Sequence, residues 1–455
     1  MTTLHRGLHH RINVFFVAAL GPVLAMLNGG ANGLAQLPPT FVRCVPNQNI
    51  SSRCYPANYS TIQAAVNAAS AGDTILVAPG TYNESVTISV GDLSLLGAQA
   101  GNDARLGRNN SSGESIVDAT GKGNSAIIVE AEFVLIDGFT VQNGSQGNQA
   151  GVDLKGICSP GPCEYGGGPL PASNAVVVNN IIQNNGIGIA MDSEGYGGLS
   201  GVLIEHNLIR NNNAPSGDGI FTSIVKGTVI TQNAFSNNQC SAMGINNASN
   251  VTINGNTSVA DGSFVVFTGT TNSTFSQNQG RDFGAEGVLP GAGDAAVAVG
   301  PGNEFLVISD NDLADGMEPV SNGIAFTNVF GRGATNGYLT VKNNSITGFA
   351  GTGILAETYA GSGEVGTLDY SLILGNQVKD NGAGGIHIEF ASPGGPYLVN
   401  GGNRVFDNVA EGNAGFDCRN DAGYSNVWIN DTGNSSYPAE LCSPPLPPMT
   451  FTPDH

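Results

Sequence analysis

A short pattern of apolar and polar positions recurs along most of the chain. Each unit has a short apolar strand, an Asn, a second short apolar segment, a polar or Gly-rich turn, and then Gly followed by a third strand. Two such units are VVVNNIIQNNGIGIAMD (176–192) and LILGNQVKDNGAGGIHIEF (372–390). Alternation with a period of two predicts β-strands, and the apolar segments are too short and too often interrupted by Gly to form helices.

The asparagines at equivalent places in these units recur at intervals of 22 to 33 residues. They are Asn180, Asn207, Asn233, Asn256, Asn278, Asn311, Asn344, Asn376 and Asn403. One unit cannot bury its apolar side alone, whereas stacked units bury a continuous core. An Asn at each bend can hydrogen-bond to the next Asn along the stack. The sequence therefore predicts one elongated stack of coils.

This repeat resembles that of the right-handed parallel β-helix proteins, the pectate lyase-like superfamily that includes pectate lyases and polygalacturonases. The resemblance covers about residues 60–430 and implies an all-β, single-domain solenoid. The segment STIQAAVNAASAGDTILVAPGTYNESVTI (60–88) resembles the N-terminal cap and first coil of secreted members such as pectinesterases. Ser60 and Gln63 have capping-box spacing, and Ile62, Ala65 and Val66 share one face of a helix that would cover the open end of the stack. The catalytic segments of pectinesterases have no counterpart, so the resemblance implies a fold and not an activity.

The two ends of the chain differ from the repeat region. A basic stretch, HRGLHHR (5–11), precedes the apolar run INVFFVAALGPVLAML (12–27) and small residues, which predicts a signal peptide over 1–35. A membrane anchor is the alternative, but Gly21 and Pro22 shorten the run. We therefore expect a secreted or periplasmic, extracytoplasmic protein, monomeric and with no membrane span in the mature chain. Residues 36–59 form a Cys-containing segment before the β-helix of 60–430, and 431–455 form a Pro-rich tail.

The chain has seven cysteines, which suits an exported protein. Their close spacing suggests three local disulfides and leaves Cys240 over, although spacing alone does not determine connectivity. The expected bridges are Cys44–Cys54, Cys158–Cys163 and Cys418–Cys442.

The formal net charge of −20 excludes a general nucleic-acid binder, because few basic groups are present to neutralise phosphates. It also argues against a polyanionic substrate unless a cation bridges the two. No Cys or His cluster has zinc-site spacing, so no metal site and no cofactor are expected. Calcium is the one ion considered, because Asp310, Asp312, Asp315 and Glu318 supply oxygen ligands; a solvated turn is the simpler interpretation.

Candidate chemistry is concentrated in the last coils. When the repeats are aligned on the Gly before the third strand, one outward row ends in Glu357, Glu389 and Arg419, and a neighbouring row ends in Leu355, His387 and Asp417. Earlier members of both rows are mostly small, apolar or neutral. The alignment predicts that five residues with functional side chains (Glu357, Glu389, His387, Asp417 and Arg419) gather on one stretch of sheet.

Successive coils lie roughly 4.8 Å apart, so Glu357 and Glu389 form a stacked carboxyl pair. Such a pair is what glycosidic hydrolysis requires, and Glu357, Glu389, His387 and Asp417 are the catalytic candidates. Arg419, Tyr359 and Phe390 are the substrate-binding candidates. A salt-linked surface is an equally valid interpretation of the same cluster.

Extra residues lengthen the last coils and could wall a groove. They lie around 281–293, 316–321, 358–368 and 391–396. The sequence thus favours a protein that acts on or binds an extracellular polysaccharide, in the manner of a glycoside hydrolase. A non-catalytic secreted or cell-surface solenoid for adhesion or carbohydrate binding and a polysaccharide lyase are the alternatives, because a fold does not determine a function.

Overall fold

The computed structural model describes most of the chain from residue 41 onwards. The described ranges are 41–45, 59–108, 113–144, 149–156, 171–191, 198–213, 217–284, 295–315, 322–327, 336–359, 365–366, 368–389, 400–422 and 425–444. The predicted signal peptide lies outside them. Residues 40–455 form one compact unit.

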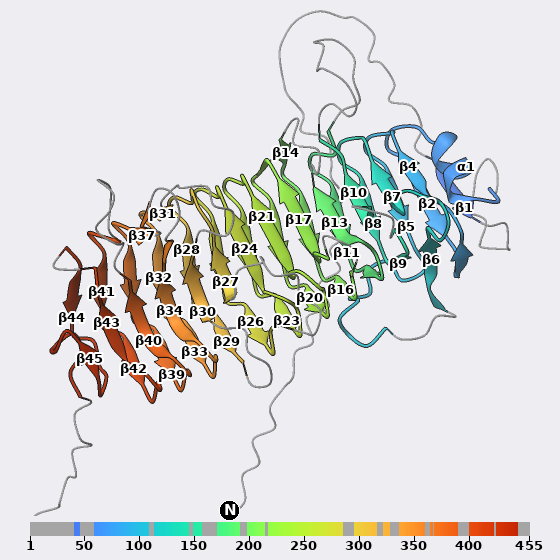
Figure 1. Ribbon diagram of the computed structural model, residues 1–455. Helices are drawn as coiled ribbons and strands as arrows, with labels where there is room; N and C mark the ends of the chain where they lie inside the picture. Colours follow the sequence, from blue (N-terminus) through green and yellow to red (C-terminus); the bar gives the residue numbers. More distant parts are fainter. Residues whose placement is uncertain are drawn as a thin grey trace, which may run out of the picture. The chain divides into compact units, whose positions relative to one another are not determined.

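Three parallel sheets, here named A, B and C, contain nearly all the strands of this unit (Figure 1). Sheet A has 14 described strands: β1 (Val42–Val45), β2 (Thr74–Val77), β5 (Ser94–Leu96), β8 (Leu135–Asp137), β11 (Val176–Val178), β15 (Leu203–Glu205), β19 (Val229–Thr231), β22 (Thr252–Asn254), β25 (Thr274–Ser276), β28 (Val307–Ser309), β32 (Thr340–Lys342), β38 (Leu372–Leu374), β41 (Arg404–Phe406) and β44 (Val427–Ile429).

Sheet B has 12 described strands: β3 (Gly80–Tyr82), β6 (Ser115–Asp118), β9 (Phe139–Gln142), β12 (Ile181–Gln183), β16 (Leu208–Arg210), β20 (Ala234–Ser236), β23 (Thr257–Val259), β26 (Gln279–Arg281), β29 (Asp312–Ala314), β33 (Ser345–Thr347), β39 (Gln377–Lys379) and β42 (Val409–Glu411).

Sheet C has 13 described strands: β4 (Val86–Ile88), β7 (Ile127–Val129), β10 (Ala150–Leu154), β13 (Ile187–Met191), β17 (Ile220–Ser223), β21 (Met243–Asn246), β24 (Val265–Thr268), β27 (Ala295–Val299), β30 (Asn322–Phe326), β34 (Thr352–Ala356), β40 (Gly384–Ile388), β43 (Cys418–Asn420) and β45 (Ser436–Tyr437). Three two-stranded pairs complete the set: β14 (Leu199–Ser200) with β18 (Val225–Lys226), β31 (Asn336–Gly337) with β37 (Leu368–Asp369), and β35 (Thr358–Tyr359) with β36 (Val365–Gly366).

The chain visits the sheets in the order A, B, C in every full coil, and each strand pairs with its equivalent one coil later. In sheet A, for example, Val177 of β11 aligns with Ile204 of β15. The middle residue of nearly every three-residue strand in sheets A and B is buried, and these side chains share one continuous core with those of sheet C. The predicted all-β solenoid is confirmed.

A ladder of asparagines runs along the bend between sheets A and B. Each side-chain oxygen accepts from the preceding coil, as when Asn233 Oδ1 accepts from the backbone N–H and the Nδ2 of Asn207 at 3.0 Å each. Each Asn Nδ2 also donates to a buried backbone carbonyl, such as that of Ile204. The residue before each ladder Asn has a positive φ, which turns the chain sharply: His206 at 56° and Gln232 at 53° are examples. The prediction that Asn bonds to Asn at the bend is confirmed.

One predicted member of this ladder was wrong. Asn403 lies in a different bend, where its Oδ1 accepts from the Ser371 N–H. The ladder continues instead from Asn376 to Asn408 and ends on Asp431. The sequence pattern failed here because Asn403 and Asn408 flank the same strand, β41, and spacing did not distinguish them.

A second ladder follows the bend between sheets B and C. It passes through Asn185, Asn212 and Asn238 and ends on Asp261. The following described positions at this bend hold Phe283 and Phe349, whose rings stack with centroids 6.4 Å apart. A shorter run, Asn381 to Asn413, then ends on Asp417.

The helix α1 (Ile62–Asn67) buries Ile62, Ala65 and Val66 against the first coil, where it contacts β1, β2 and β4. Its N-cap is Thr61, whose hydroxyl oxygen accepts from the Ala64 N–H at 3.1 Å. The expectation that Ser60 begins the helix was therefore wrong by one residue. The Glu84 carboxylate takes up the next two free donors, the N–H groups of Ile62 and Gln63, at 2.9 Å each.

The paired strands extend beyond 60–430 at both ends. Strand β1 lies in the Cys-containing segment and pairs with β2, and β45 lies in the predicted tail and pairs with β43. Among the described helices, none is long and apolar enough to cross a membrane.

The disulfide Cys418–Cys442 is confirmed, with the two Cα atoms 6.1 Å apart. Cys44 is disulfide-bonded as well, and its expected partner Cys54 lies outside the described residues, as do Cys158 and Cys163. Cys240 is free, as predicted.

Candidate active site

Three carboxylate side chains stand in register at the ends of successive sheet C strands. Ala356 aligns with Ile388 in the pairing of β34 with β40, which places Glu357 beside Glu389. Ile388 aligns with Asn420 in the pairing of β40 with β43, which places Glu389 beside Asp421. The Glu389 N–H donates to the Ala356 carbonyl at 3.0 Å, and the Asp421 N–H donates to the Ile388 carbonyl at 2.9 Å. We call Glu357, Glu389 and Asp421 the acidic row.

His387 lies within this row rather than apart from it. Its Nε2 is 3.0 Å from Asp421 Oδ2, and its Nδ1 is 4.0 Å from Glu389 Oε1. The His387 side chain is 15% exposed, against 33% for Glu389, so the ring is held by its surroundings while Glu389 remains accessible. One ring nitrogen is thus fixed by Asp421 and the other faces Glu389.

Arg419 is displaced from its predicted position. It aligns with His387 and not with Glu389, and its Nε lies 2.9 Å from Asp421 Oδ2. Its guanidinium carbon is 5.9 Å from the centroid of the Phe416 ring. Arg419 therefore places a positive charge against the third carboxylate of the row.

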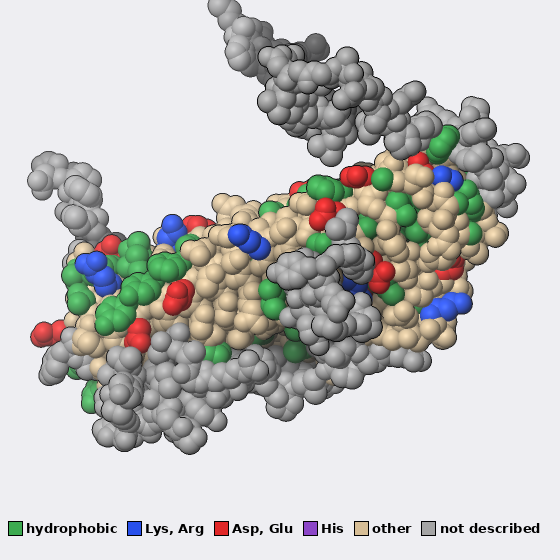
Figure 2. Space-filling model, turned by 90° about the horizontal axis from the view of Figure 1, so that it is seen from above, with side chains coloured by type: hydrophobic (Ala, Val, Ile, Leu, Met, Phe, Trp, Pro, Cys, Tyr) green, Lys and Arg blue, Asp and Glu red, His purple; other side chains and the backbone are tan. Residues whose placement is uncertain are grey.

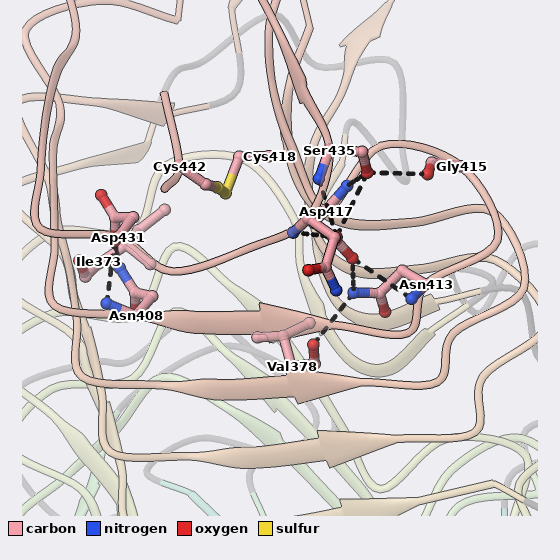
Figure 3. The surroundings of a disulfide bond; sticks show 11 residues. Ile373, Val378, Asn408, Asn413, Gly415, Asp417, Cys418, Asp431, Ser435 and Cys442 are labelled. Carbon is pink, nitrogen blue, oxygen red and sulfur yellow. Dashed lines mark hydrogen bonds between the residues drawn. A yellow bond between two sulfur atoms is a disulfide. The ribbon is translucent and has the colours of Figure 1, made fainter. Parts of the chain in front are cut away.

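The prediction that Asp417 faces outward was wrong. Asp417 is buried, and its Oδ1 accepts from both the Nδ2 and the backbone N–H of Asn413, at 2.9 and 3.3 Å. Its Oδ2 accepts from the N–H groups of Asn434 and Ser435 at 2.8 and 3.2 Å (Figure 3). Asp417 ends a ladder inside the solenoid and does not belong to the acidic row.

Both displacements have one cause: the pairing of β40 with β43 is shifted by two residues from the one that the sequence predicts, so His387 aligns with Arg419 and not with Asp417. Cys418 aligns with Ile386 of the preceding coil and is fully buried. Its disulfide to Cys442 lies beside the ends of two ladders (Figure 3). Alignment on the glycines predicts that Gly415 comes directly before the strand, whereas Gly415 belongs to the bend. With Cys418 in the core, R-N-D at 419–421 matches H-I-E at 387–389, which is the signal that would have identified Asp421.

The other predicted contributors lie partly outside the described residues. Tyr359 is the last residue of β35, which pairs antiparallel with β36, and Phe390 lies outside the described residues, as do most of the lengthened loops. Of the acidic run, Asp310 accepts from Asn343 Nδ2 at 3.2 Å and Asp312 pairs with Arg281; Glu318 is not described. Within the described part of the chain, no three His, Cys, Asp or Glu side chains are grouped to hold a metal ion.

Known proteins share this architecture. The family described as "Right handed beta helix region" matches residues 125–305. The PL6 family alginate lyase AlyGC has 13% identity and a TM-score of 0.50, over 84% of this chain and 51% of that one, so this chain spans about half its length. A mannuronic acid specific polysaccharide family 6 lyase from human gut microbiota has 11% identity and a TM-score of 0.51, over 82% and 84% of the two chains.

Pectate lyase Pel9A has 12% identity and a TM-score of 0.38, over 88% of this chain and 78% of that one. No curated protein matches the chain by sequence. The chain has the right-handed parallel β-helix fold.

Proposed function

We propose that this protein is an exported enzyme that hydrolyses glycosidic bonds in an extracellular polysaccharide at the acidic row. The observation that carries the proposal is the register of Glu357, Glu389 and Asp421 on three successive coils with His387 between the last two. The solved structures of similar fold include enzymes described as acting on polysaccharides, which supports a carbohydrate substrate.

The spacing of the row suits a retaining reaction. Side chains in register on adjacent parallel strands stand about 5 Å apart. Retaining glycosidases hold their two carboxyl groups about 5 to 5.5 Å apart, whereas inverting enzymes need a wider gap for water. Glu357 and Glu389 are therefore assigned as the reacting pair.

His387 distinguishes the two glutamates. When Nε2 donates to Asp421 and a second proton is on Nδ1, the charged ring stabilises negative charge on Glu389, so Glu389 is assigned as the nucleophile and Glu357 as the acid. Glu389 attacks the anomeric carbon while Glu357 gives its proton to the leaving oxygen, and the sugar becomes bound to Glu389 as an ester. Glu357 then removes a proton from water as the water oxygen attacks the anomeric carbon. The ester bond to Glu389 breaks, which releases the sugar and restores both groups. Asp421 and Arg419 position His387, and no cofactor is assigned to the reaction.

The test is a panel of purified polysaccharides, scored for new reducing ends and for the absorbance of unsaturated products. Hydrolysis gives the first signal alone, and elimination by a lyase gives both. Glu357→Gln and Glu389→Gln are each expected to lower turnover at least about 1,000-fold, because each removes a group that takes part in bond breaking.

Glu205→Gln is the matched control. Glu205 lies on the outer face of sheet A and its side chain is 32% exposed, close to the 33% of Glu389. Wild-type rates in both test variants, or unsaturated products from the wild-type protein, would contradict the proposal.

A further inference from the structure

Three aromatic rings form a row on the bend between sheets C and A. Phe305, Tyr338 and Tyr370 occupy equivalent places in three successive coils. Their ring centroids are 5.4 and 5.9 Å apart, and the ring planes differ by 11° and 17°. They are 51%, 55% and 62% exposed. We call them the aromatic row.

The backbone at these positions is unfavourable for such residues. The φ angles are 53°, 58° and 47°, in the left-handed region that bulky side chains avoid at a cost of order 1–3 kcal/mol each. Earlier coils place Asn250 and Asn272 there, also with positive φ, and Asn tolerates this conformation well. Exposed aromatic side chains are thus present where Asn would fold more easily.

The next coil is shaped to accept the last ring. Gly402 occupies the equivalent position, and a Cβ built there would lie 2.7 Å from Cδ1 of Tyr370. Only glycine leaves room for the Tyr370 ring in its present place. The row is therefore a fixed arrangement of rings whose faces cover one another and whose edges, with the two tyrosine hydroxyls, meet solvent.

A largely apolar surface, interrupted by the exposed Arg404, continues from the row onto sheet A. The outward residues of its last three strands include Leu372 and Leu374, Phe406, and Val427 and Ile429, of which the last two are 45% and 48% exposed. The equivalent residues on β22 and β25 are polar: Thr252 and Asn254, then Thr274 and Ser276. Figure 2 shows hydrophobic side chains gathered towards the C-terminal (left) end of the face that it presents. We call the aromatic row and these five residues the sheet A stripe.

The size and charge of the stripe favour a narrow neutral ligand. It spans about five coils along the solenoid and little more than the length of one three-residue strand across it, roughly 300 Å². This area is below the roughly 800 Å² per partner of a stable protein interface. The net charge of −20 opposes contact with a second copy of the chain or with a polyanion.

A neutral glycan matches both the narrow width of the stripe and the negative charge of the chain. Its sugar rings present flat C–H faces to the aliphatic residues, and its hydroxyl groups meet the edges of Tyr338 and Tyr370. We propose that the sheet A stripe is a second polysaccharide-binding site, separate from the acidic row, which takes a neutral glycan chain lying along the solenoid axis. The choice of a glycan rests on the proposed function.

The experiment measures binding without turnover. Affinity electrophoresis of the full chain in gels containing mixed-linkage β-glucan, xylan or galactomannan is compared with gels containing alginate or polygalacturonate. At least one neutral polymer is expected to retard the protein, and the double variant Tyr338→Asn/Tyr370→Asn is expected to bind it about tenfold more weakly or worse. Melting temperature should not fall, because Asn occupies the same bend in earlier coils.

Two further variants sharpen the test. Phe133→Ala is the matched control, since Phe133 is 53% exposed with φ 58° at the same bend of an early coil, and it should bind as the wild-type does. Gly402→Ala displaces the Tyr370 ring and should weaken binding with the tyrosines retained. Glu389→Gln should bind normally, so loss of hydrolysis and loss of the stripe are separate results.

Three outcomes would overturn the inference: equal binding of neutral polymers by the double variant, retardation by the acidic polymers only, or no retardation by any polymer. Light scattering that showed a dimer in the wild-type and a monomer in the double variant would assign the stripe to self-association instead.

Discussion

Asp431 accepts two hydrogen bonds from Asn408 through one carboxylate oxygen, from the backbone N–H at 2.9 Å and from Nδ2 at 2.8 Å. Its other oxygen is buried and has no hydrogen-bond partner. Burial raises the pKa of Asp431 to about 6, against the lowering effect of the bonds from Asn408. The first ladder therefore ends on a carboxyl group that the fold holds more easily in its neutral form.

Asp431→Asn should make the protein less sensitive to rising pH. Because the folded-state pKa is raised, the stabilising contribution is complete below about pH 4 and is lost as pH rises through about 6. The difference amounts to at most about 3 kcal/mol between pH 4 and 8. Urea unfolding at pH 4 and pH 8 should show that the free energy of unfolding of the variant, relative to that of the wild-type, is higher at pH 8 than at pH 4. An unchanged difference between the two proteins would refute the assignment.

Asp261→Asn tests the same physics at the second ladder. Burial raises the pKa of Asp261 to about 7, so its stabilising contribution is lost at a higher pH than that of Asp431. Ser258 donates to Asp261 Oδ2 at 2.6 Å and can instead accept from an amide after its hydroxyl rotates. We expect the variant to be stabilised relative to the wild-type at pH 8, with the difference in stability developing between about pH 4 and about pH 7 in urea unfolding experiments.

Removing one amide from the middle of the first ladder should be costly. Asn233→Ala leaves the buried N–H of Asn207 and the carbonyl of Ile204 without these partners, a loss of about 2–4 kcal/mol in free energy of unfolding. Asn254→Ala is the control, because Asn254 points outward and bonds to Ser276; its cost should stay below about 1 kcal/mol. Similar costs for the two variants would show that the ladder contributes little.

The disulfide should stabilise the last coil more than the rest of the solenoid. It closes a loop with a sequence separation of 24 residues, for which about 3 kcal/mol is expected. Cys442→Ser should therefore increase amide hydrogen exchange in β43 and β45 first, because each coil contacts only its neighbours. Cys240→Ser is the control, and faster exchange in sheet A near β11 would contradict local action.

Glu389→Gln should leave the fold as stable as before or slightly more so. The change removes a negative charge next to that of Asp421 in the acidic row, which relieves repulsion of up to about 1 kcal/mol at exposed positions. Thermal melting of this variant beside Glu205→Gln checks the sign. A melting temperature lowered by several degrees would mean that Glu389 is a structural residue.

The repeat could be predicted from the sequence because each coil requires the same residues, a buried apolar residue in the middle of the strand and an amide side chain at the bend. Glu357, Glu389 and His387 could be placed together for the same reason, since the coils that carry them differ little in length between the bend and the strand. The register of the last coil against the preceding one could not be predicted. There, a cysteine fills the core position that Ile386 fills one coil earlier, and nothing local shows that Gly415 belongs to the bend. The aromatic row could not be predicted from the sequence, because the φ angles and the exposure of its residues are properties of the folded chain.

The asparagine ladders have a direction. Each Asn side chain accepts hydrogen bonds from the coil before through Oδ1 and donates one to the coil after through Nδ2. Asn can therefore follow Asn in any number of successive coils, whereas an Asp carboxylate accepts the hydrogen bond from the coil before and has no N–H to donate to the next. Asp261, Asp417 and Asp431 each stand where their ladder stops. Each ladder can lengthen by duplication of a coil upstream of its terminal Asp without any new side-chain chemistry. Asp261 ends only its own ladder, because the three sheets continue for further coils, whereas Asp417 and Asp431 stand in the last coils.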